Sequence, residues 1–355
     1  MEVVKLNTYI VATPKPHIGG MYWIFLSIET RCGITGIGEV YSASFHPEVV
    51  VKAIEDVFER YLKGHDPHHI ERFYRECFSS GFTQRPDLTM MGVLSGLEIA
   101  CWDVIGKAAN KPIYELIGGK VHDKLRSYTY LYPEDKNGVL NYEDPELGAK
   151  SAIKFMEQGF TALKFDPAGP YSIYSGHQIS LSRLNHCENY CREVREAVGD
   201  RCDILIGTHG QLTPASAIRL AKRLEKFDPL WFEEPVPPGQ SGAMAEVAKN
   251  TSIPVATGER LTSKYEFYDI LKNNSFGLLR FKLKNPLIIT YWSTRNLLCF
   301  LEKLNSITVF GPAFPQKKQL VNGFNDSAYR FFSISTGTIN PAITTSWFSK
   351  TSIDS

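Results

Sequence analysis

The sequence predicts an α+β domain followed by an α/β domain with the architecture of a TIM-type (β/α) barrel. Two observations predict this fold class. Strand-like runs precede helical runs within residues 1–124, and helices alternate with short apolar strands from about residue 125. A chain of 355 residues is long enough for two cores. We therefore expect a first domain over 1–124, a barrel over 125–320 and an atypical C-terminal tail over 321–355.

The first domain is expected to begin as a sheet and to continue as helices. Residues 21–30 and 33–41 are rich in β-branched and aromatic side chains, with a turn between them. Further along, apolar residues recur every three or four positions. This period predicts helices over 47–64, 67–80 and 92–111.

Four helix-then-strand pairs follow in the second domain. The strand-like segments are 161–165, 203–207, 230–234 and 253–259, and each comes after a stretch with helical periodicity. Such alternation implies parallel βα units and favours a barrel, whose active site lies at the C-terminal ends of its strands. A dinucleotide-binding fold is the weaker alternative, because the sequence has no G-x-G-x-x-G and no P-loop motif.

The composition is that of a soluble globular enzyme, with 43% hydrophobic and 22% charged residues. A formal net charge of +1 gives no electrostatic reason to expect nucleic acid or an acidic membrane surface as a partner. We find no apolar run near the roughly 18–20 residues of a membrane helix. The N-terminus lacks the pattern of a signal peptide. Seven scattered cysteines, an odd number, indicate reduced thiols and a cytoplasmic protein.

Charged and polar residues gather where the predicted barrel strands end. They are Lys164, Asp166, His209, Glu233, Glu234 and Glu259. Carboxylates at successive strand ends are costly unless a cation faces them, and oxygen ligands from neighbouring strands suit Mg²⁺. The alternative interpretation is that these are surface loop residues, paired with arginines such as Arg260.

Four stretches of the sequence resemble one known family. They are SGLEIACWDVIGKAANKPIYELIGGKVHDKLRSY (95–128), TALKFDPAGP (161–170), GTHGQLTPASAIRLAKRLEKFDPLWFEEPVPP (207–238) and PVATGERL (254–261). On these motifs the chain resembles the enolase superfamily, in its mandelate racemase and muconate-lactonizing branch, over about residues 1–275. The resemblance implies an α+β capping domain on a modified TIM barrel. It also implies Mg²⁺, which stabilises the enolate formed when a base removes a proton α to a carboxylate.

The family's three metal carboxylates lie on successive strands at regular spacing, and the resemblance carries over two of them. Glu233 and Glu259 are 26 residues apart, and the same step back from Glu233 falls on Gly207, where the family normally has an aspartate. His209, two residues further, returns to the same side of the strand. We expect Mg²⁺ to be held by Glu233 and Glu259, with help from His209 or Asp166.

The resemblance also implies the catalytic residues. Lys164 matches the first lysine of the family's Lys-x-Lys pair, and Asp166 stands at the second position. A histidine at the offset of His209 resembles an acid/base catalyst of the mannonate dehydratase branch, and imidazole titrates near neutral pH. The family's next strand end carries an aspartate or lysine 23 residues past the third ligand, which falls on Lys282. These four residues are the catalytic candidates.

Two loops of the capping domain, 13–23 and 42–48, match the family's specificity loops and are expected to close over the barrel mouth. The residues predicted to contact substrate are His17, Tyr22, Trp23 and His46 from these loops and Glu234 from the barrel. For Trp23 a place in the core of the capping sheet is an equal alternative.

The end of the chain departs from the family pattern. The resemblance fades after about Gly277, and no histidine follows His209. The barrel's final part is either strongly diverged or the product of a reading-frame shift that damages the last two βα units.

The leading hypothesis is a lyase that dehydrates a sugar acid, an aldonate or aldarate, with Mg²⁺ as cofactor and with activity impaired by the atypical C-terminus. A racemase, epimerase or cycloisomerase that uses Lys164 and Lys282 on opposite faces of the substrate is the alternative within the family. A catalytically inactive family member is the alternative from another class. The expected partner is a small carboxylate, with no nucleic acid or membrane, and relatives are commonly homo-oligomers.

Overall fold

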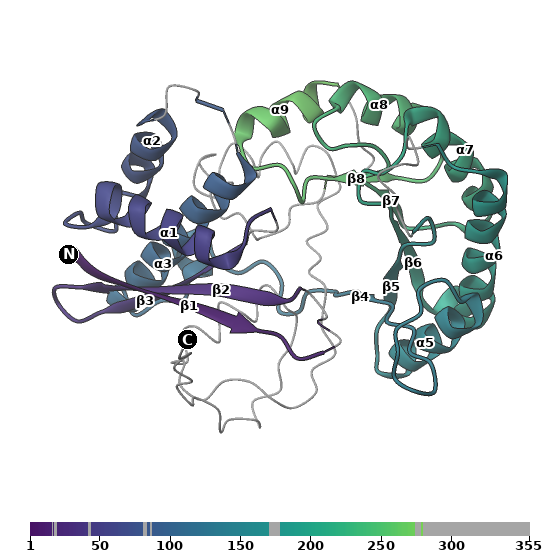
Figure 1. The fold of residues 1–355 in the computed structure, drawn as a ribbon, viewed down its shortest axis with the longest axis horizontal. Coiled ribbons are helices and arrows are strands. Elements are labelled where there is room, and N and C mark those ends of the chain that lie inside the picture. Colours follow the sequence, from purple (N-terminus) through teal and green to yellow (C-terminus); the bar gives the residue numbers. More distant parts are fainter. Residues whose placement is uncertain are drawn as a thin grey trace.

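The computed structural model of the chain describes residues 1–279, apart from 16, 18–19, 42–43, 81–83, 86, 170–177 and 274–277. Lys282, the predicted end of the barrel and the tail over 321–355 lie outside the described residues. The described chain forms two parts, a small sheet with helices and an arc of parallel strands covered by helices (Figure 1). The predicted α+β domain and α/β barrel architecture are therefore confirmed for this part of the chain.

The N-terminal part, the capping domain, is a three-stranded antiparallel sheet with helices packed on it. The strands β1 (Val3–Ala12), β2 (Tyr22–Thr30) and β3 (Thr35–Val40) lie in chain order. The helical segments are α1 (Pro47–Val57), the π-helix η1 (Phe58–Leu62), α2 (Ile70–Ser80), α3 (Leu88–Ala108) and α4 (Ile113–Leu116). Sheet and helices share one core, to which Leu26, Ile54 and Leu97 belong.

Glycines bring helix α3 close to strand β3. A Cβ atom on Gly38 would overlap the backbone carbonyl of Gly96, and one on Gly36 would overlap that of Ala100. The carboxylate of Asp103 on the helix also accepts a hydrogen bond from the backbone N–H of Ile37, at 2.9 Å. Backbone contact and this partly buried hydrogen bond together fix the helix against the sheet.

Among the described helices, α3 is also the one that is long and apolar enough to cross a membrane, by length and composition alone. Two acidic residues, Glu98 and Asp103, interrupt its apolar sequence. In the structure 72% of its most apolar window is buried inside the protein. Burial of this kind is the behaviour of a core helix.

The second part is a parallel sheet whose strands lie in chain order. They are β4 (Thr129–Tyr130), β5 (Ala162–Phe165), β6 (Asp203–Gly207), β7 (Trp231–Glu233), β8 (Val255–Thr257) and β9 (Leu278–Leu279). Helices α5 (Pro145–Glu157), α6 (Leu181–Val198), α7 (Pro214–Leu224), α8 (Ser241–Lys249) and α9 (Lys264–Lys272) lie along the outer side of the arc (Figure 1). Two short 3₁₀ helices, η2 (Gly199–Arg201) and η3 (Glu225–Phe227), follow α6 and α7.

Side-chain caps explain where most of these helices begin. Asp144, Ser180, Thr213 and Ser263 each precede a helix and accept a hydrogen bond from a backbone N–H of its first turn. A proline follows the first and third of these caps, where its missing N–H costs nothing.

The alternation of side chains along the barrel strands separates two environments. The outer faces share the main core with the helices, and a small inner cluster consists of Tyr128, Ala162, Leu205, Trp231 and Ala256. Alternate residues of a strand share a face. Lys164, Gly207 and Glu233 stand two positions after members of the inner cluster, so they too face the inside of the arc.

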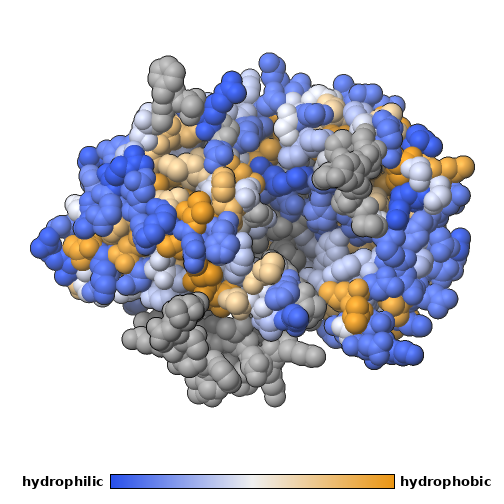
Figure 2. Space-filling view, in the orientation of Figure 1, coloured by the Kyte–Doolittle hydropathy of each residue, from blue (hydrophilic) through white to orange (hydrophobic). Residues whose placement is uncertain are grey.

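The two parts touch through their helices. The rings of Phe78 on α2 and Tyr265 on α9 stack with centroids 6.5 Å apart. Elsewhere the visible outer surface of both parts is mainly hydrophilic, with small hydrophobic patches (Figure 2).

Candidate active site

A buried ion pair joins the ends of strands β5 and β7. The ammonium of Lys164 lies 2.8 Å from Oε1 of Glu233, and the two side chains are only 6% and 3% exposed. The indole N–H of Trp231 donates to the other carboxylate oxygen, Oε2, at 3.0 Å. Both oxygens of Glu233 therefore have a partner within the protein.

The charge state of Lys164 follows from its neighbours. Burial by itself lowers the pKa of a lysine, but the carboxylates of Glu233 and Glu259 outweigh it, and the pKa of Lys164 is raised. The side chain is therefore a buried ammonium at neutral pH. A lysine in this state supplies positive charge and does not accept a proton.

Strand β6 makes room for the lysine side chain. Gly207 pairs in register with Glu233 on β7, and Lys164 lies on the strand at the other side of β6. A Cβ atom on Gly207 would lie 2.8 Å from Cε of Lys164 and 3.6 Å from its Nζ. The space that a side chain at position 207 would need is thus taken by the end of Lys164.

The loop after β6 presents His209 to Asp166. Nδ1 of His209 lies 2.9 Å from Oδ2 of Asp166, and the two side chains are 47% and 11% exposed. Oδ1 of Asp166 accepts the backbone N–H of Ala168 at 3.1 Å. An ionised carboxylate only accepts hydrogen bonds, so it selects the tautomer with a proton on Nδ1 and leaves Nε2 for proton transfer.

Backbone geometry explains why a histidine stands between two glycines here. His209 has φ 52° and Gly210 φ 73°, a left-handed turn in which glycine is favoured and histidine is uncommon. The hydroxyl of Thr208 bonds the carbonyls of Glu233 and Glu234, at 2.9 and 3.0 Å. The turn is therefore anchored on β7, and the strained residue is the one that carries the exposed imidazole.

Glu234 and Arg260 form a second pair at the strand ends. The guanidinium of Arg260 approaches Oε2 of Glu234 through Nη2 at 2.7 Å and through Nε at 2.9 Å. Burial raises the pKa of Glu234, and Arg260 offsets part of that rise. The sequence alternative, in which strand-end carboxylates pair with arginines such as Arg260, therefore holds for Glu234. It differs in one respect, because this pair is largely buried and is not a surface contact. Its predicted contact with substrate stays a prediction.

The capping-loop candidates have their described contacts within the capping domain. Nδ1 of His17 is 2.9 Å from the carbonyl of Thr13 in its own loop. His46 caps helix α1, and its ring lies 6.3 Å from that of Tyr22. Trp23 is half-buried on β2. The structure brings Tyr22 and His46 together, and the substrate contacts of all four residues stay predictions.

Two tyrosines near the site were missed by the sequence analysis. Tyr130 on β4 is half-buried with its ring centroid 6.0 Å from Nζ of Lys164, and desolvation together with the charge of Asp166 raises its pKa well above the ordinary value. Tyr41, just after β3 of the capping domain, is partly exposed, and partial desolvation followed by the charge of Glu259 raises its pKa. It therefore lies within electrostatic reach of the barrel residues. The sequence signal for both was an aromatic residue at a strand end.

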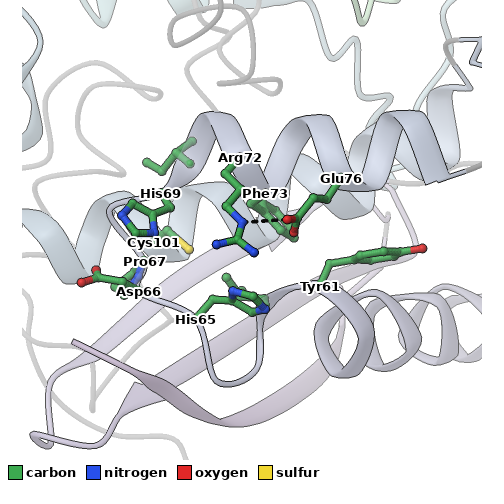
Figure 3. A pocket seen from close by; sticks show the side chains of 11 residues that line it. Tyr61, His65, Asp66, Pro67, His69, Arg72, Phe73, Glu76 and Cys101 are labelled. Carbon is green, nitrogen blue, oxygen red and sulfur yellow. Dashed lines mark hydrogen bonds and ion pairs between the residues drawn. The ribbon is translucent and has the colours of Figure 1, made fainter.

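A separate small pocket lies in the capping domain between η1 and α2 (Figure 3). Its lining includes Tyr61, His65, Asp66, Arg72 and Glu76. Arg72 and Glu76 bind each other at 2.7 Å, and Asp66 binds the N-terminal ammonium at 2.9 Å. These charged groups satisfy one another within the capping domain, so the pocket is not part of the candidate site.

Comparison with known proteins agrees with this fold. Residues 148–285 match the family model described as enolase C-terminal domain-like, and residues 16–118 match that of the mandelate racemase/muconate lactonizing enzyme N-terminal domain. The chain belongs to the mandelate racemase/muconate lactonizing enzyme family. It is the branch of the enolase superfamily that the four motifs indicated.

Similar proteins are found among curated proteins and solved structures. The D-xylonate dehydratase of Haloferax volcanii is 31% identical over 283 residues, 78% of this chain and 65% of the relative. The D-galactonate dehydratase of Xanthomonas oryzae pv. oryzae is 30% identical over 280 residues, 79% of this chain and 67% of the relative. The chain thus spans about two thirds of the length of these relatives. A family structure from Burkholderia SAR-1 superposes with a TM-score of 0.82 and 57% identity, covering 88% of this chain and 77% of that chain.

The described residues do not assemble the three-ligand metal site expected for this family. Among them, no group of three or more histidine, cysteine, aspartate or glutamate side chains is placed to hold a metal ion. Gly207 supplies no ligand, and Glu233 is bound by Lys164. The two candidates for the third ligand, His209 and Asp166, bind each other.

Proposed function

We propose that this member of the mandelate racemase/muconate lactonizing enzyme family dehydrates a sugar acid, an aldonate or aldarate, through acid–base chemistry of His209 and Asp166. The observation that carries the proposal is the 2.9 Å contact between these side chains after strands β5 and β6. The substrate class is supported by two relatives that are named D-xylonate dehydratase and D-galactonate dehydratase.

The imidazole performs both proton transfers. Neutral His209 takes the proton α to the substrate carboxylate on Nε2, and the carboxylate of Asp166 stabilises the imidazolium that forms. The same nitrogen then gives its proton to the hydroxyl on the neighbouring carbon, which leaves as water. The enol that remains takes up a proton at C3 and loses the proton of its C2 hydroxyl, which gives a 2-oxo-3-deoxy acid.

Two cations give the site its positive charge. Arg260 is one-third exposed and has N–H groups beyond the two that approach Glu234, so we assign it to the substrate carboxylate. Lys164 is buried and stabilises the negative charge that develops on the substrate as the α-proton leaves. No step is assigned to Mg²⁺, because the described residues do not form its expected ligand set.

The ion pair of Lys164 favours dehydration over racemisation or cycloisomerisation. Those reactions, in the form predicted, use Lys164 and Lys282 on opposite faces of the substrate, so Lys164 must exchange a proton with the substrate. The contact with Glu233 holds Lys164 in its protonated form. We therefore assign the role of proton acceptor to His209 and not to Lys164.

A substrate panel tests the proposal. D-xylonate, D-galactonate and other aldonates and aldarates are incubated with the full chain, with and without Mg²⁺, and 2-oxo acid is detected with semicarbazide. We expect product from the wild-type chain and at least a hundred-fold less from H209N. The matched control is H68N, because His68 is likewise an exposed histidine paired with an aspartate, Asp66, at 2.7 Å. A folded wild-type chain that is silent on the whole panel would support the inactive alternative.

We also propose that the chain works in the cytoplasm as a homo-oligomer. The six cysteines of the described residues are free thiols, as a reducing compartment requires. Size-exclusion chromatography with light scattering measures the assembly directly, and a mass of one chain would contradict it.

A further inference from the structure

Position 207 and the side chain of Lys164 use the same space. Gly207 lies between the two partners of the buried ion pair, next to Lys164 on β5 and in register with Glu233 on β7. A Cβ atom at 207 would come within 2.8 Å of Cε of Lys164, closer than such atoms approach in proteins. The lysine end is flexible and can rotate away. Any side chain at 207 therefore displaces the ammonium from its present position.

The ammonium stands where a divalent cation would otherwise compete for Glu233. It binds Oε1 at 2.8 Å, while the indole of Trp231 binds Oε2 at 3.0 Å. A metal ion that binds Glu233 would place its positive charge beside the ammonium on Oε1 or the indole N–H on Oε2, and both contacts are buried. Removing one partner from a buried ion pair is strongly unfavourable, since it leaves the other charge without compensation.

Replacing the ammonium of Lys164 with a metal ion would also lack the oxygen ligands that normally stabilise a bound metal. Mg²⁺ takes oxygen ligands and is held by carboxylates. Gly207 provides no oxygen from its side chain, and the described residues contain no three-ligand group near Glu233 that would repay the lost ion pair.

We propose that Gly207 and Lys164 act together as an internal substitute for a metal ligand and its cation. The glycine opens the space, and the lysine ammonium fills it and neutralises Glu233. The chain therefore binds divalent metal weakly, and a carboxylate introduced at position 207 exchanges the ammonium for a metal ion.

Metal titration of the full chain tests the proposal and does not depend on the proposed activity. Free Mn²⁺ is followed by electron paramagnetic resonance during titration of the wild type, G207D, G207A and K164M. G207D both displaces the ammonium and adds a ligand, and we expect it to bind Mn²⁺ at least tenfold more tightly than the wild type. The matched variant G207A displaces the ammonium without adding a ligand, so its gain should be smaller. Adding E233Q to G207D should abolish the gain.

K164M provides an independent test, because it removes the ammonium from Glu233 without changing strand β6. We expect its Mn²⁺ affinity to rise at least threefold over the wild type. Wild-type affinity equal to that of folded G207D would overturn the proposal. If G207D does not fold, unchanged or weaker Mn²⁺ binding by K164M would overturn it alone.

Discussion

The imidazole of His209 and the carboxylate of Asp166 meet at 2.9 Å, although 43 residues separate them in the chain. They meet because parallel strands β5 and β6 end at the same edge of the sheet. Asp166 is largely buried and held by the backbone, whereas His209 is half-exposed on a strained turn. An acceptor fixed in the protein thus orients an imidazole that faces the solvent, which is the arrangement that the proposed acid–base chemistry needs.

The first prediction concerns the orienting carboxylate. D166N keeps the shape of the side chain and removes its charge, so the imidazolium of His209 loses its stabilisation. We expect kcat/KM for sugar-acid dehydration to fall about 10²-fold or more, with the fold unchanged by circular dichroism. Activity of D166N within threefold of the wild type would contradict the assigned role of Asp166.

The second prediction concerns Arg260 as the group that binds the substrate carboxylate. R260M removes the charge and should raise KM at least about tenfold while changing kcat less, because this contact exists before and during the reaction. R223M is the matched control, since Arg223 has similar exposure and pairs with Glu188 at 2.9 Å on the outer helices. Equal KM values for the two variants would contradict the assignment of Arg260 to the substrate carboxylate.

The third prediction concerns the contact between α3 and β3 of the capping domain. G38A places a methyl group against the carbonyl of Gly96, and the backbone there cannot move aside cheaply. We expect a loss of about 3 kcal/mol or more in the free energy of unfolding, measured with urea. G239A is the control, because a Cβ at Gly239 meets no atom within 4 Å. Similar urea midpoints for the two variants would refute the close packing.

The fourth prediction concerns pH and Glu225, which joins η3 to the segment before β8. Its carboxylate accepts hydrogen bonds from the backbone N–H of Ser252 at 2.9 Å and from the hydroxyl of Thr251 at 3.0 Å, and it binds Lys222. The bond from Ser252, followed by that from Lys222, lowers the pKa of Glu225 from 4.5 to about 2. A carboxyl with a lowered folded-state pKa stabilises the fold above its unfolded pKa and loses that contribution as pH falls through the folded value.

E225Q should therefore be less stable than the wild type at pH 7, and the difference should shrink between pH 4.5 and pH 2. Urea midpoints across this range measure it. E246Q, a change at an exposed glutamate of α8, is expected to follow the wild type at every pH. A constant difference between E225Q and the wild type from pH 7 to pH 2 would contradict the assignment.

The fold was predictable where a pattern extends over enough residues. The period of three and four identified α1 to α3 and α5 to α8, and apolar segments identified β5 to β8, whereas α4 and α9 were not predicted. Strand β4 was missed because two residues, Thr129 and Tyr130, are too short for any period. Helix α3 was expected from residue 92 and begins at Leu88, where the side chain of Asp87 provides the cap.

The side chains at the strand ends could be predicted as candidates for the site, but their contacts could not. The family resemblance, together with the 26-residue step from Glu233 to Glu259, implied that Gly207 stands where a ligand is expected. It did not show that Lys164 fills the space, because that depends on the reach of a flexible side chain across two strands. His209 and Asp166 were alternatives for one role, and the turn geometry at His209 made them partners. The proximity of Tyr41 to Glu259 depends on how the capping domain is placed relative to the barrel, and no local sequence pattern predicts that placement.

Proton nuclear magnetic resonance of D-galactonate incubated with the folded wild-type chain tests the central claim most directly. Dehydration removes the proton at C2 and the hydroxyl at C3. The account therefore predicts loss of the C2 proton signal together with new methylene signals at C3 of a 2-oxo-3-deoxy acid, with no such change for H209N. An unchanged spectrum for D-galactonate, D-xylonate and the other acids of the panel would contradict it, as would equal rates for the wild type and H209N.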